Sequence, residues 1–278
     1  MVTFDYAQDV NQHYGRQDLG SAILVGLQAA GKDLNQLSHD DLAPVDHFHI
    51  RGKDATLKLA AQVGLRNDLH VLDVGGGLGG AARTLAAEFG CRVTVLDLTE
   101  EYCRVGEMLT ARTGLTDRVA FEHGSALVMP FPDGSFDVVW TQHSSMNIED
   151  KQQLYAEIYR VLKPRGRLAL YEIMASAVQP IHFPVPWASG SAISFLRPAE
   201  AIRTLIKATG FREVSWVDVS RPSLEWFQQR AAAFAGGALP PLGLHLLLGE
   251  NFGLAFKNQV RNLAEDRIAV IEAEFERG

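Results

Sequence analysis

The spacing of hydrophobic positions changes near residue 65. Before that point, Leu19, Ile23 and Leu27 recur every four residues, which is the period of an amphipathic helix. From residue 69 onward, short apolar runs alternate with helical patterns. The pattern therefore predicts a helical N-terminal segment followed by a region of alternating strands and helices.

The alternating region is typical of a parallel sheet with helices on both faces. The expected strands lie at 70–75, 91–98, 118–124, 136–142 and 166–174. The expected helices between them lie at 80–89, 99–113 and 149–162. This order predicts an α/β fold, a doubly wound, Rossmann-like and mostly parallel sheet of seven strands once the C-terminal elements are added.

Beyond residue 175 the pattern is less regular. Prolines in 179–187 fix φ and remove backbone donors, so this stretch is not a regular helix. The remaining expected elements are a helix at 198–209, a strand at 211–220, a mainly helical segment at 223–262 and a strand at 267–277. A helical cap inserted before the last strand is therefore expected.

Length and composition fit one elaborated domain. The chain has 278 residues, of which 47% are hydrophobic and 21% are charged, as in globular proteins with a full core. The expected organisation is a helical lid over 1–64, a cofactor-binding core over 65–222, and a helical cap with the final strand over 223–278.

The charge balance excludes one class of partner. The net charge is −7 and no run of lysine and arginine is present, whereas a nucleic-acid binder needs a concentrated basic surface. A small-molecule substrate is the better expectation. The N-terminus has no signal-peptide pattern, and the apolar stretch 242–248 is too short for membrane insertion.

Location and assembly follow less directly from the sequence. Cys91 and Cys103 form no C-x-x-C pair, so we expect reduced thiols in a cytoplasmic protein. The apolar stretch 242–256 is compatible with a homodimer interface or with a pocket lid.

The segment VLDVGGGLGG, residues 71–80, joins a buried strand to a helix through five glycines. Glycine lets the backbone approach a ligand closely, because it has no side chain and accepts positive φ. Gly75, Gly77 and Gly80 also satisfy G-x-G-x-x-G, and Asp97 ends the next strand, where dinucleotide enzymes bind ribose hydroxyls. An NAD-dependent oxidoreductase is therefore one interpretation.

Asp73 favours a different nucleoside cofactor. It stands two residues before the first glycine, where a carboxylate would repel a pyrophosphate. S-adenosylmethionine carries an ammonium and a sulfonium but no phosphate, so Asp73 suits it directly or through water. Asp97 then fits the adenosine ribose.

The sequence resembles the class I S-adenosylmethionine-dependent methyltransferases over most of residues 69–175. The resemblance rests on the glycine loop, on FDVVWTQHSSMNIED after the turn PFPDGS, and on LYAEIYRVLKPRGRLALYEI. Within that class it is similar to the group of sarcosine/dimethylglycine and ubiquinone/menaquinone-biosynthesis methyltransferases. The shared points are GGGLGGAARTLA, GSAL and RPSLEWF.

The resemblance implies roles for individual residues. Gly75 and Gly77 would line the cofactor, and Asp97 would accept the ribose hydroxyls. Many relatives have Asp where Ser125 stands, so adenine recognition here would rest on backbone and a hydroxyl. The other implied cofactor residues are Leu98 on the adenine face, Ser125 and Ala126 at its edge, Gln142 at the methionine part, and Tyr14 and Arg51 in the lid.

His143 follows Gln142 at the expected catalytic mouth. It is the candidate catalytic residue, because an imidazole can deprotonate a hydroxyl or an ammonium near neutral pH. The alternative is that it orients a carboxylate or holds the loop. Ser144, Ser145 and Asn147 would add polar contacts there.

The remaining histidines and aromatics favour plainer roles. His47 and His49 lack the further ligands of a tetrahedral site, so no metal is predicted. A lid or substrate contact, or else a surface or packing role, is expected for both, and His245 is expected to pack within the cap. Four aromatic side chains would either frame a cationic acceptor or form core, and these are Trp187, Trp216, Trp226 and Phe227.

These observations leave several functions open. The leading hypothesis is methyl transfer to nitrogen or oxygen of a small metabolite such as sarcosine or dimethylglycine, with Arg51 or Arg197 as a clamp for its carboxylate. The alternative acceptor is a phenolic or quinol natural product, with His143 as base. Other classes are the NAD-dependent oxidoreductase and a binding protein that has lost catalysis.

Overall fold

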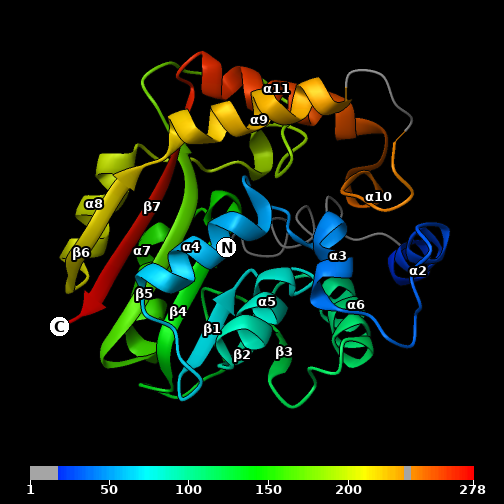
Figure 1. The fold of residues 1–278 in the computed structure, drawn as a ribbon. Helices are drawn as coiled ribbons and strands as arrows, with labels where there is room; N and C mark the ends of the chain where they lie inside the picture. The colour runs from blue at the N-terminus through cyan, green and yellow to red at the C-terminus, as the bar shows by residue number, and fades with distance from the viewer. Residues whose placement is uncertain (1–17, 235–238) are drawn as a thin grey trace.

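The computed structural model describes residues 18–234 and 239–278. It contains a seven-stranded sheet in the order β3-β2-β1-β4-β5-β7-β6. Strands β1 to β5 pair in parallel, whereas β7 lies antiparallel between β5 and β6. The expected fold class is therefore confirmed (Figure 1).

The described elements follow the chain in an alternating order. The strands are β1 (His70–Val74), β2 (Arg92–Asp97), β3 (Val119–His123), β4 (Phe136–Gln142), β5 (Leu162–Ala175), β6 (Phe211–Asp218) and β7 (Ile268–Arg277). The longer helices are α2 (Leu19–Ala29), α3 (His39–Asp46), α4 (Gly52–Gln62), α5 (Gly80–Phe89), α6 (Glu100–Arg112), α7 (Lys151–Val161), α8 (Ala199–Ala208), α9 (Ser220–Phe234) and α11 (Phe252–Ala264). The short helices are η1 (Ser145–Asn147), η2 (Ser191–Ile193), α10 (His245–Leu248) and η3 (Gly249–Asn251).

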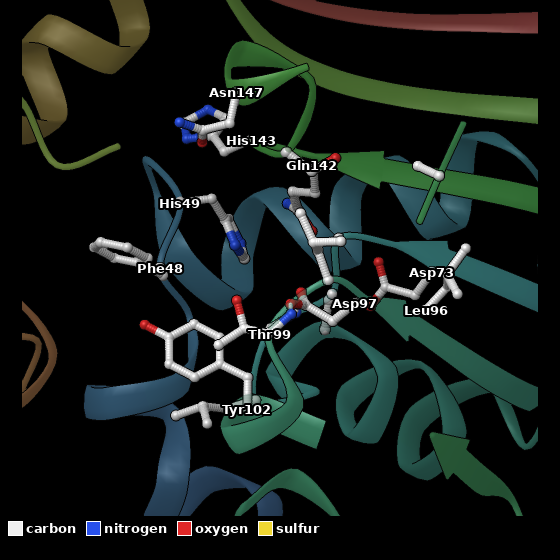
Figure 2. A pocket seen from close by; sticks show the side chains of 18 of the residues that line it. Phe48, His49, Asp73, Leu96, Asp97, Thr99, Tyr102, Gln142, His143 and Asn147 are labelled. Carbon is white, nitrogen blue, oxygen red and sulfur yellow. Dashed lines mark hydrogen bonds between the residues drawn. The ribbon is translucent and has the colours of Figure 1, made fainter. Parts of the chain in front are cut away.

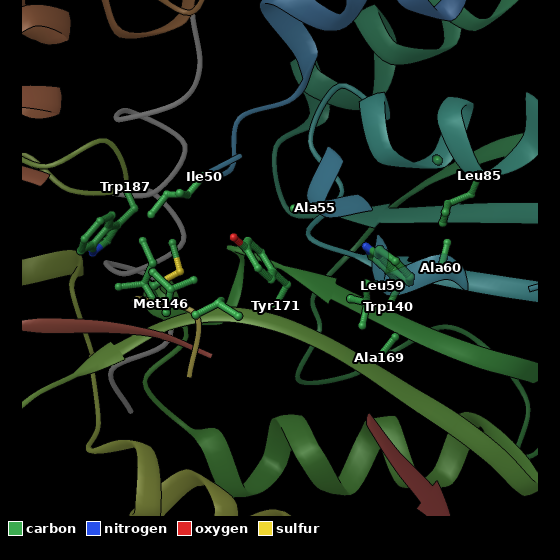
Figure 3. Packing of buried hydrophobic residues seen from close by; sticks show 14 of the residues in the cluster. Ile50, Ala55, Leu59, Ala60, Leu85, Trp140, Met146, Ala169, Tyr171 and Trp187 are labelled. Carbon is green, nitrogen blue, oxygen red and sulfur yellow. The ribbon is translucent and has the colours of Figure 1, made fainter. Parts of the chain in front are cut away.

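Two hydrophobic layers cover the two faces of the sheet. On one face, Leu59 of α4 and Leu85 of α5 pack around Trp140 of β4 (Figure 3). On the other face, α7 and α8 contribute Ile158 and Ile206. Because both faces are covered, the central strands carry buried apolar residues on both faces rather than on one face alone.

The N-terminal helices dock on the start of α5. A Cβ atom on Gly80 would lie 2.2 Å from the backbone oxygen of Asp46, so only glycine permits this approach of α3. The Arg83 guanidinium also binds the Asp46 carboxylate, with Nη2 2.7 Å from Oδ2 and both side chains almost fully buried. Helix α3 is thus fixed beside the glycine loop.

The C-terminal helices lie over the carboxyl edge of the sheet, where α9 and α11 run side by side (Figure 1). Helix α9 begins at Ser220, inside the range predicted for the core, and β7 returns to the core sheet although its residues were grouped with the cap. The helical insertion before the last strand is present. The division into 1–64, 65–222 and 223–278 remains a prediction.

Strand β5 is longer than its apolar pattern suggests. It starts at Leu162, because Leu162 pairs with Phe136 at the start of β4, before a shift in register after which Arg167 pairs with Val138. The segment 163–165 contains Lys163 and Arg165 and no alternation of apolar and polar residues. The sequence pattern therefore does not predict a strand there.

Candidate active site

A pocket of about 150 Å³ lies at the carboxyl ends of β1, β2 and β4 (Figure 2). In an open α/β sheet, this edge is where ligands bind. Phe48 and His49 approach the pocket from the side opposite Asp73 and Asp97 (Figure 2). The sequence-predicted residues that line it are Asp73, Gly75, Gly77, Asp97, Leu98, Ser125, Ala126, Gln142 and His143.

The glycine loop passes tightly beneath this pocket. Gly75 and Gly77 have φ values of 70° and 56°, which side chains rarely adopt. A Cβ atom on Gly76 would lie 2.5 Å from Oδ2 of Asp73. The three glycines therefore allow the backbone to turn over the Asp73 carboxylate.

Asp97 organises the floor of the pocket. Its Oδ2 atom accepts a hydrogen bond from the Gly77 amide at 2.8 Å, and its Oδ1 atom accepts one from the Thr99 amide at 2.8 Å. Each carboxylate oxygen can accept more than one hydrogen bond. Asp97 therefore fixes the glycine loop and still has lone pairs for ligand hydroxyls.

Asp73 is a buried carboxyl that forms no ion pair within residues 18–234 and 239–278. Its side chain is 1% exposed, and Oδ2 has no hydrogen-bond partner among the described residues. Burial and the nearby Asp97 raise its pKa from 3.8 to about 7. A buried acid in this condition favours a cationic ligand.

Gln142 ends β4 next to this carboxyl, since Asp73 pairs with Trp140 across β1 and β4. The Gln142 Oε1 atom accepts hydrogen bonds from Trp140 Nε1 at 3.0 Å and from Thr56 Oγ1 at 3.1 Å. Its Nε2 atom is buried and has no hydrogen-bond partner among the described residues. Two of the residues that line the pocket therefore carry a buried donor and a buried acceptor without partners among the described residues.

His143 stands at the edge of the pocket in an unusual backbone conformation, with φ of 53°. Its ring stacks on Tyr171, with centroids 5.2 Å apart and planes 7° apart. Burial lowers its pKa to about 3, and Nε2 has no hydrogen-bond partner among the described residues. His143 is therefore neutral over the physiological range and can accept a hydrogen bond.

A buried carboxylate supports the loop that follows His143. The Ser144 and Ser145 amides each donate to Glu172 Oε1 at 3.3 Å, and Glu172 is fully buried. Asn147 donates from Nδ2 to two backbone oxygens, those of Trp187 and Ile193. These contacts hold the loop in place, and Ser144 and Asn147 also line the pocket.

A second and larger cavity adjoins the pocket. Its volume is about 920 Å³, and His143 and His49 line both spaces. Its walls are largely apolar and aromatic, and include Phe48, Ile50, Met146, Trp187, Trp226, Phe227, Phe252, Phe256 and Val260. Three of the four candidate aromatics thus surround this cavity, while Trp216 packs in the opposite layer of the core.

Some predicted residues lie apart from the cofactor pocket. Arg51 lines the larger cavity and caps α4, Arg197 is exposed and lines neither space, and Tyr14 lies outside the described residues. His245 lines the larger cavity against Phe252 rather than packing only within the cap.

Several residues of the site were not anticipated from the sequence. Thr56 lies in the middle of α4 and Glu172 within β5, so both reach the site through the tertiary fold and no local pattern signals them. The lid also adds residues beside the cofactor pocket, namely Val45, Asp46, Phe48 and His49.

Fold and site together define a class of protein. A doubly wound sheet with a glycine loop after β1 and an acid at the end of β2 is the arrangement of α/β proteins that bind a nucleoside cofactor. Residues 72–170 match the family model described as a methyltransferase domain. The chain therefore contains a class I S-adenosylmethionine-dependent methyltransferase domain, as the sequence predicted.

Similar proteins with assigned activities are also methyltransferases. The chain is 32% identical over 170 residues to a glycine/sarcosine/dimethylglycine N-methyltransferase of Actinopolyspora halophila, covering 61% of this chain and 28% of that protein. It is 27% identical to a sarcosine/dimethylglycine N-methyltransferase of Halorhodospira halochloris, covering 76% and 75%. It is also 41% identical over 100 residues to a probable tocopherol O-methyltransferase of Oryza sativa, covering 36% and 28%. The chain thus spans about a quarter of the length of some relatives.

Solved structures share the whole fold. A geranyl diphosphate C-methyltransferase from Streptomyces coelicolor, in complex with Mg²⁺, geranyl diphosphate and S-adenosyl-L-homocysteine, has a TM-score of 0.72 with 17% identity and 99% coverage of both chains. The [4+2]-cyclase SpnF has a TM-score of 0.67 with 22% identity and 96% coverage of both. At sequence identities this low, the similarity is evidence for a shared fold alone.

Residues 18–234 and 239–278 contain no helix that is long and apolar enough to cross a membrane. They also contain no cluster of three or more His, Cys, Asp or Glu side chains suited to holding a metal ion.

Proposed function

We propose that this protein transfers the methyl group of S-adenosylmethionine to an oxygen of a bulky, largely apolar small molecule. The observation that carries the proposal is the position of His143, which lines both the glycine-loop pocket and the larger cavity. A cofactor in the first space and an acceptor in the second would meet beside its imidazole. A cytoplasmic location and a homodimer remain predictions from the sequence.

The cofactor pocket supplies groups that complement S-adenosylmethionine. Asp97 offers lone pairs to the ribose hydroxyls, and ionised Asp73 favours the positive charge of the ammonium or sulfonium. Leu98 lines the same pocket with Ser125 and Ala126, where the adenine would bind. The cofactor contributes an electrophilic methyl group on a positively charged sulfur.

The protein's task in this reaction is mainly alignment. Methyl transfer from a sulfonium is an in-line displacement with a neutral leaving group, so holding the nucleophile and the methyl group in line lowers the barrier. A hydroxyl becomes strongly acidic as its oxygen bonds to the methyl group. Neutral His143, although its pKa is only about 3, can accept the proton at that stage through Nε2.

The size and lining of the larger cavity favour the apolar acceptor. Ligand pockets that enclose drug-sized molecules measure about 300–1,000 Å³, and this cavity measures about 920 Å³. Phenolic or quinol molecules would bury their rings against Trp187 and Phe227. The similarity to the probable tocopherol O-methyltransferase supports this class.

An amino-acid-like amine is the second candidate, because Arg51 lines the same cavity and would pair with the carboxylate of sarcosine or dimethylglycine. The similarity to the two N-methyltransferases supports it. Arg197 does not contribute, since it lines neither space.

Two measurements test the proposed function. Titration with S-adenosylhomocysteine and with NAD should show tight binding of the first alone, whereas tight binding of NAD alone would overturn the proposal. Radiolabelled S-adenosylmethionine should then label phenols and quinols in preference to sarcosine and dimethylglycine. Labelling of the amines instead would favour the second candidate, and binding without labelling of any acceptor would favour a protein that has lost catalysis.

The raised pKa of Asp73 predicts pH-dependent cofactor binding. In the free protein this carboxyl ionises near pH 7, while a cationic ligand binds its ionised form better. Affinity for S-adenosylhomocysteine should therefore increase about 25-fold from pH 5.5 to 7.5, because the ionised fraction of the Asp73 carboxyl rises from about 3% to about 76% over this range. Asp73→Asn should show a flat profile over this range by calorimetry, and equal profiles for the two proteins would contradict the prediction.

The same carboxyl affects stability with the opposite trend. Because its folded-state pKa lies above the unfolded value of 3.8, the folded state binds more protons between these values. The stabilisation from the protonated form is full below pH 4 and is lost as the pH rises through 7. Bound cofactor should offset this loss.

A further inference from the structure

The side-chain amide of Gln142 is oriented by groups from two different parts of the fold. Its Oε1 atom accepts hydrogen bonds from Trp140 in β4 and from Thr56 in α4. Trp140 and Thr56 are both fully buried, and Gln142 is 9% exposed. The amide is thus held from below the pocket, with its Nε2 atom left without a partner among the described residues.

The chemistry of the partners excludes the flipped amide. An indole nitrogen only donates hydrogen bonds, so the group that faces Trp140 must be the Gln142 oxygen. A flip would place the amide NH₂ group against the indole N–H and leave two buried donors opposed, which costs more than a lost hydrogen bond. The NH₂ group is therefore the end of the amide that remains available to a ligand in the cofactor pocket, which Gln142 lines.

The lid strengthens this orientation through His49. The His49 Nε2 atom lies 2.9 Å from the Gly52 carbonyl oxygen, which can only accept, so Nε2 carries the proton. Thr56 Oγ1 lies 3.1 Å from the same nitrogen and accepts from it. The Thr56 hydroxyl is then free to donate to Gln142, so His49, Thr56 and Gln142 form a directed chain.

We propose that Thr56 and Trp140 are positioning residues that aim the Gln142 NH₂ group at the carboxylate of the cofactor's amino-acid part. This inference rests on the proposed function. Among the charged groups of S-adenosylmethionine, the ammonium and sulfonium accept no hydrogen bond, whereas the carboxylate does. Asp73 and Gln142 would then distinguish the two ends of that amino acid, one by charge and the other by hydrogen bonding.

The test compares two ligands that differ in the amino-acid part. S-adenosylhomocysteine contains it and 5′-methylthioadenosine lacks it. Thr56→Val removes only the hydroxyl, and we expect it to weaken S-adenosylhomocysteine binding about tenfold, the effect of one hydrogen bond to a charged group. Binding of 5′-methylthioadenosine should change less than twofold, and Thr56→Ser should restore the wild-type affinity.

Gln142→Glu provides a second variant. A carboxylate keeps both buried hydrogen bonds, to Trp140 and Thr56, but presents an acceptor to the pocket. This variant should weaken the binding of S-adenosylhomocysteine more than tenfold and the binding of 5′-methylthioadenosine much less. The matched control is Thr141→Val, because the Thr141 hydroxyl is buried next to Gln142 and has no partner among the described residues; both affinities should stay within twofold of wild type.

Each outcome has a distinct meaning. If Thr56→Val and Gln142→Glu weaken the binding of both ligands equally, or of neither, the proposed positioning role is wrong. If Thr56→Val fails to fold, Gln142→Glu alone decides between these results. If the wild-type protein binds neither ligand, the proposed function itself fails.

Discussion

Asp46→Ala is expected to lower the free energy of unfolding by about 3–5 kcal/mol, because it leaves the buried Arg83 guanidinium without its counter-charge. The two side chains are 0% and 1% exposed, and Nη2 lies 2.7 Å from Oδ2. The remaining Arg83 contacts, to Thr110 Oγ1 and the Gly106 carbonyl oxygen, are neutral. The loss should appear as a lower urea midpoint with an unchanged slope.

The matched control for that variant is Asp40→Ala. Asp40 also pairs with a cation of the lid, Lys53, at 2.6 Å, but its side chain is 62% exposed. Exposed pairs contribute about 1 kcal/mol or less, so this variant should be nearly as stable as the wild type. Similar losses in both variants would show that the buried pair does not anchor α3 to α5.

His143→Asn is expected to lower turnover about 100-fold or more, which is the contribution of a positioned general base. Asparagine is the suitable replacement because it tolerates the positive φ of this residue better than alanine. Binding of S-adenosylhomocysteine should stay close to that of the wild type. Turnover is measured with the labelled cofactor and the acceptor that the screen identifies.

His245→Asn is the control, since His245 lines the larger cavity but not the junction with the cofactor pocket. It should affect the Michaelis constant of the acceptor more than turnover. Near-normal turnover of the His143 variant would leave His143 with a structural role on Tyr171.

The parts of the fold that the sequence predicted are those fixed by local pattern. The largely apolar run 136–142 has the same bounds as β4, because a strand covered on both faces places apolar residues at successive positions. The helix expected at 80–89 is α5, bounded by glycines at both ends. By contrast, the start of β5 at Leu162 depends on pairing with β4, which no local pattern encodes.

The same distinction applies to the site. Asp73 and Asp97 were predictable because Asp97 ends one identified strand and Asp73 lies one residue before the end of another, and parallel strands bring their carboxyl ends to one edge. Thr56 was not, since its role depends on how α4 packs against Trp140. Arg51 was predicted either to bind the cofactor or to clamp an acceptor's carboxylate; it lies at the N-cap of α4 and lines the larger cavity.

The position of β7 in the sheet has a consequence for how a nascent chain assembles. Strands β5 and β6 follow each other in the sequence, but β6 is joined to the sheet only through β7. Until residues 268–277 have been synthesised, β6 has no partner and the long β5 presents an open edge. Such an edge invites pairing with other chains. Translation of α9 to α11 therefore sets the interval during which this protein most needs protection from aggregation.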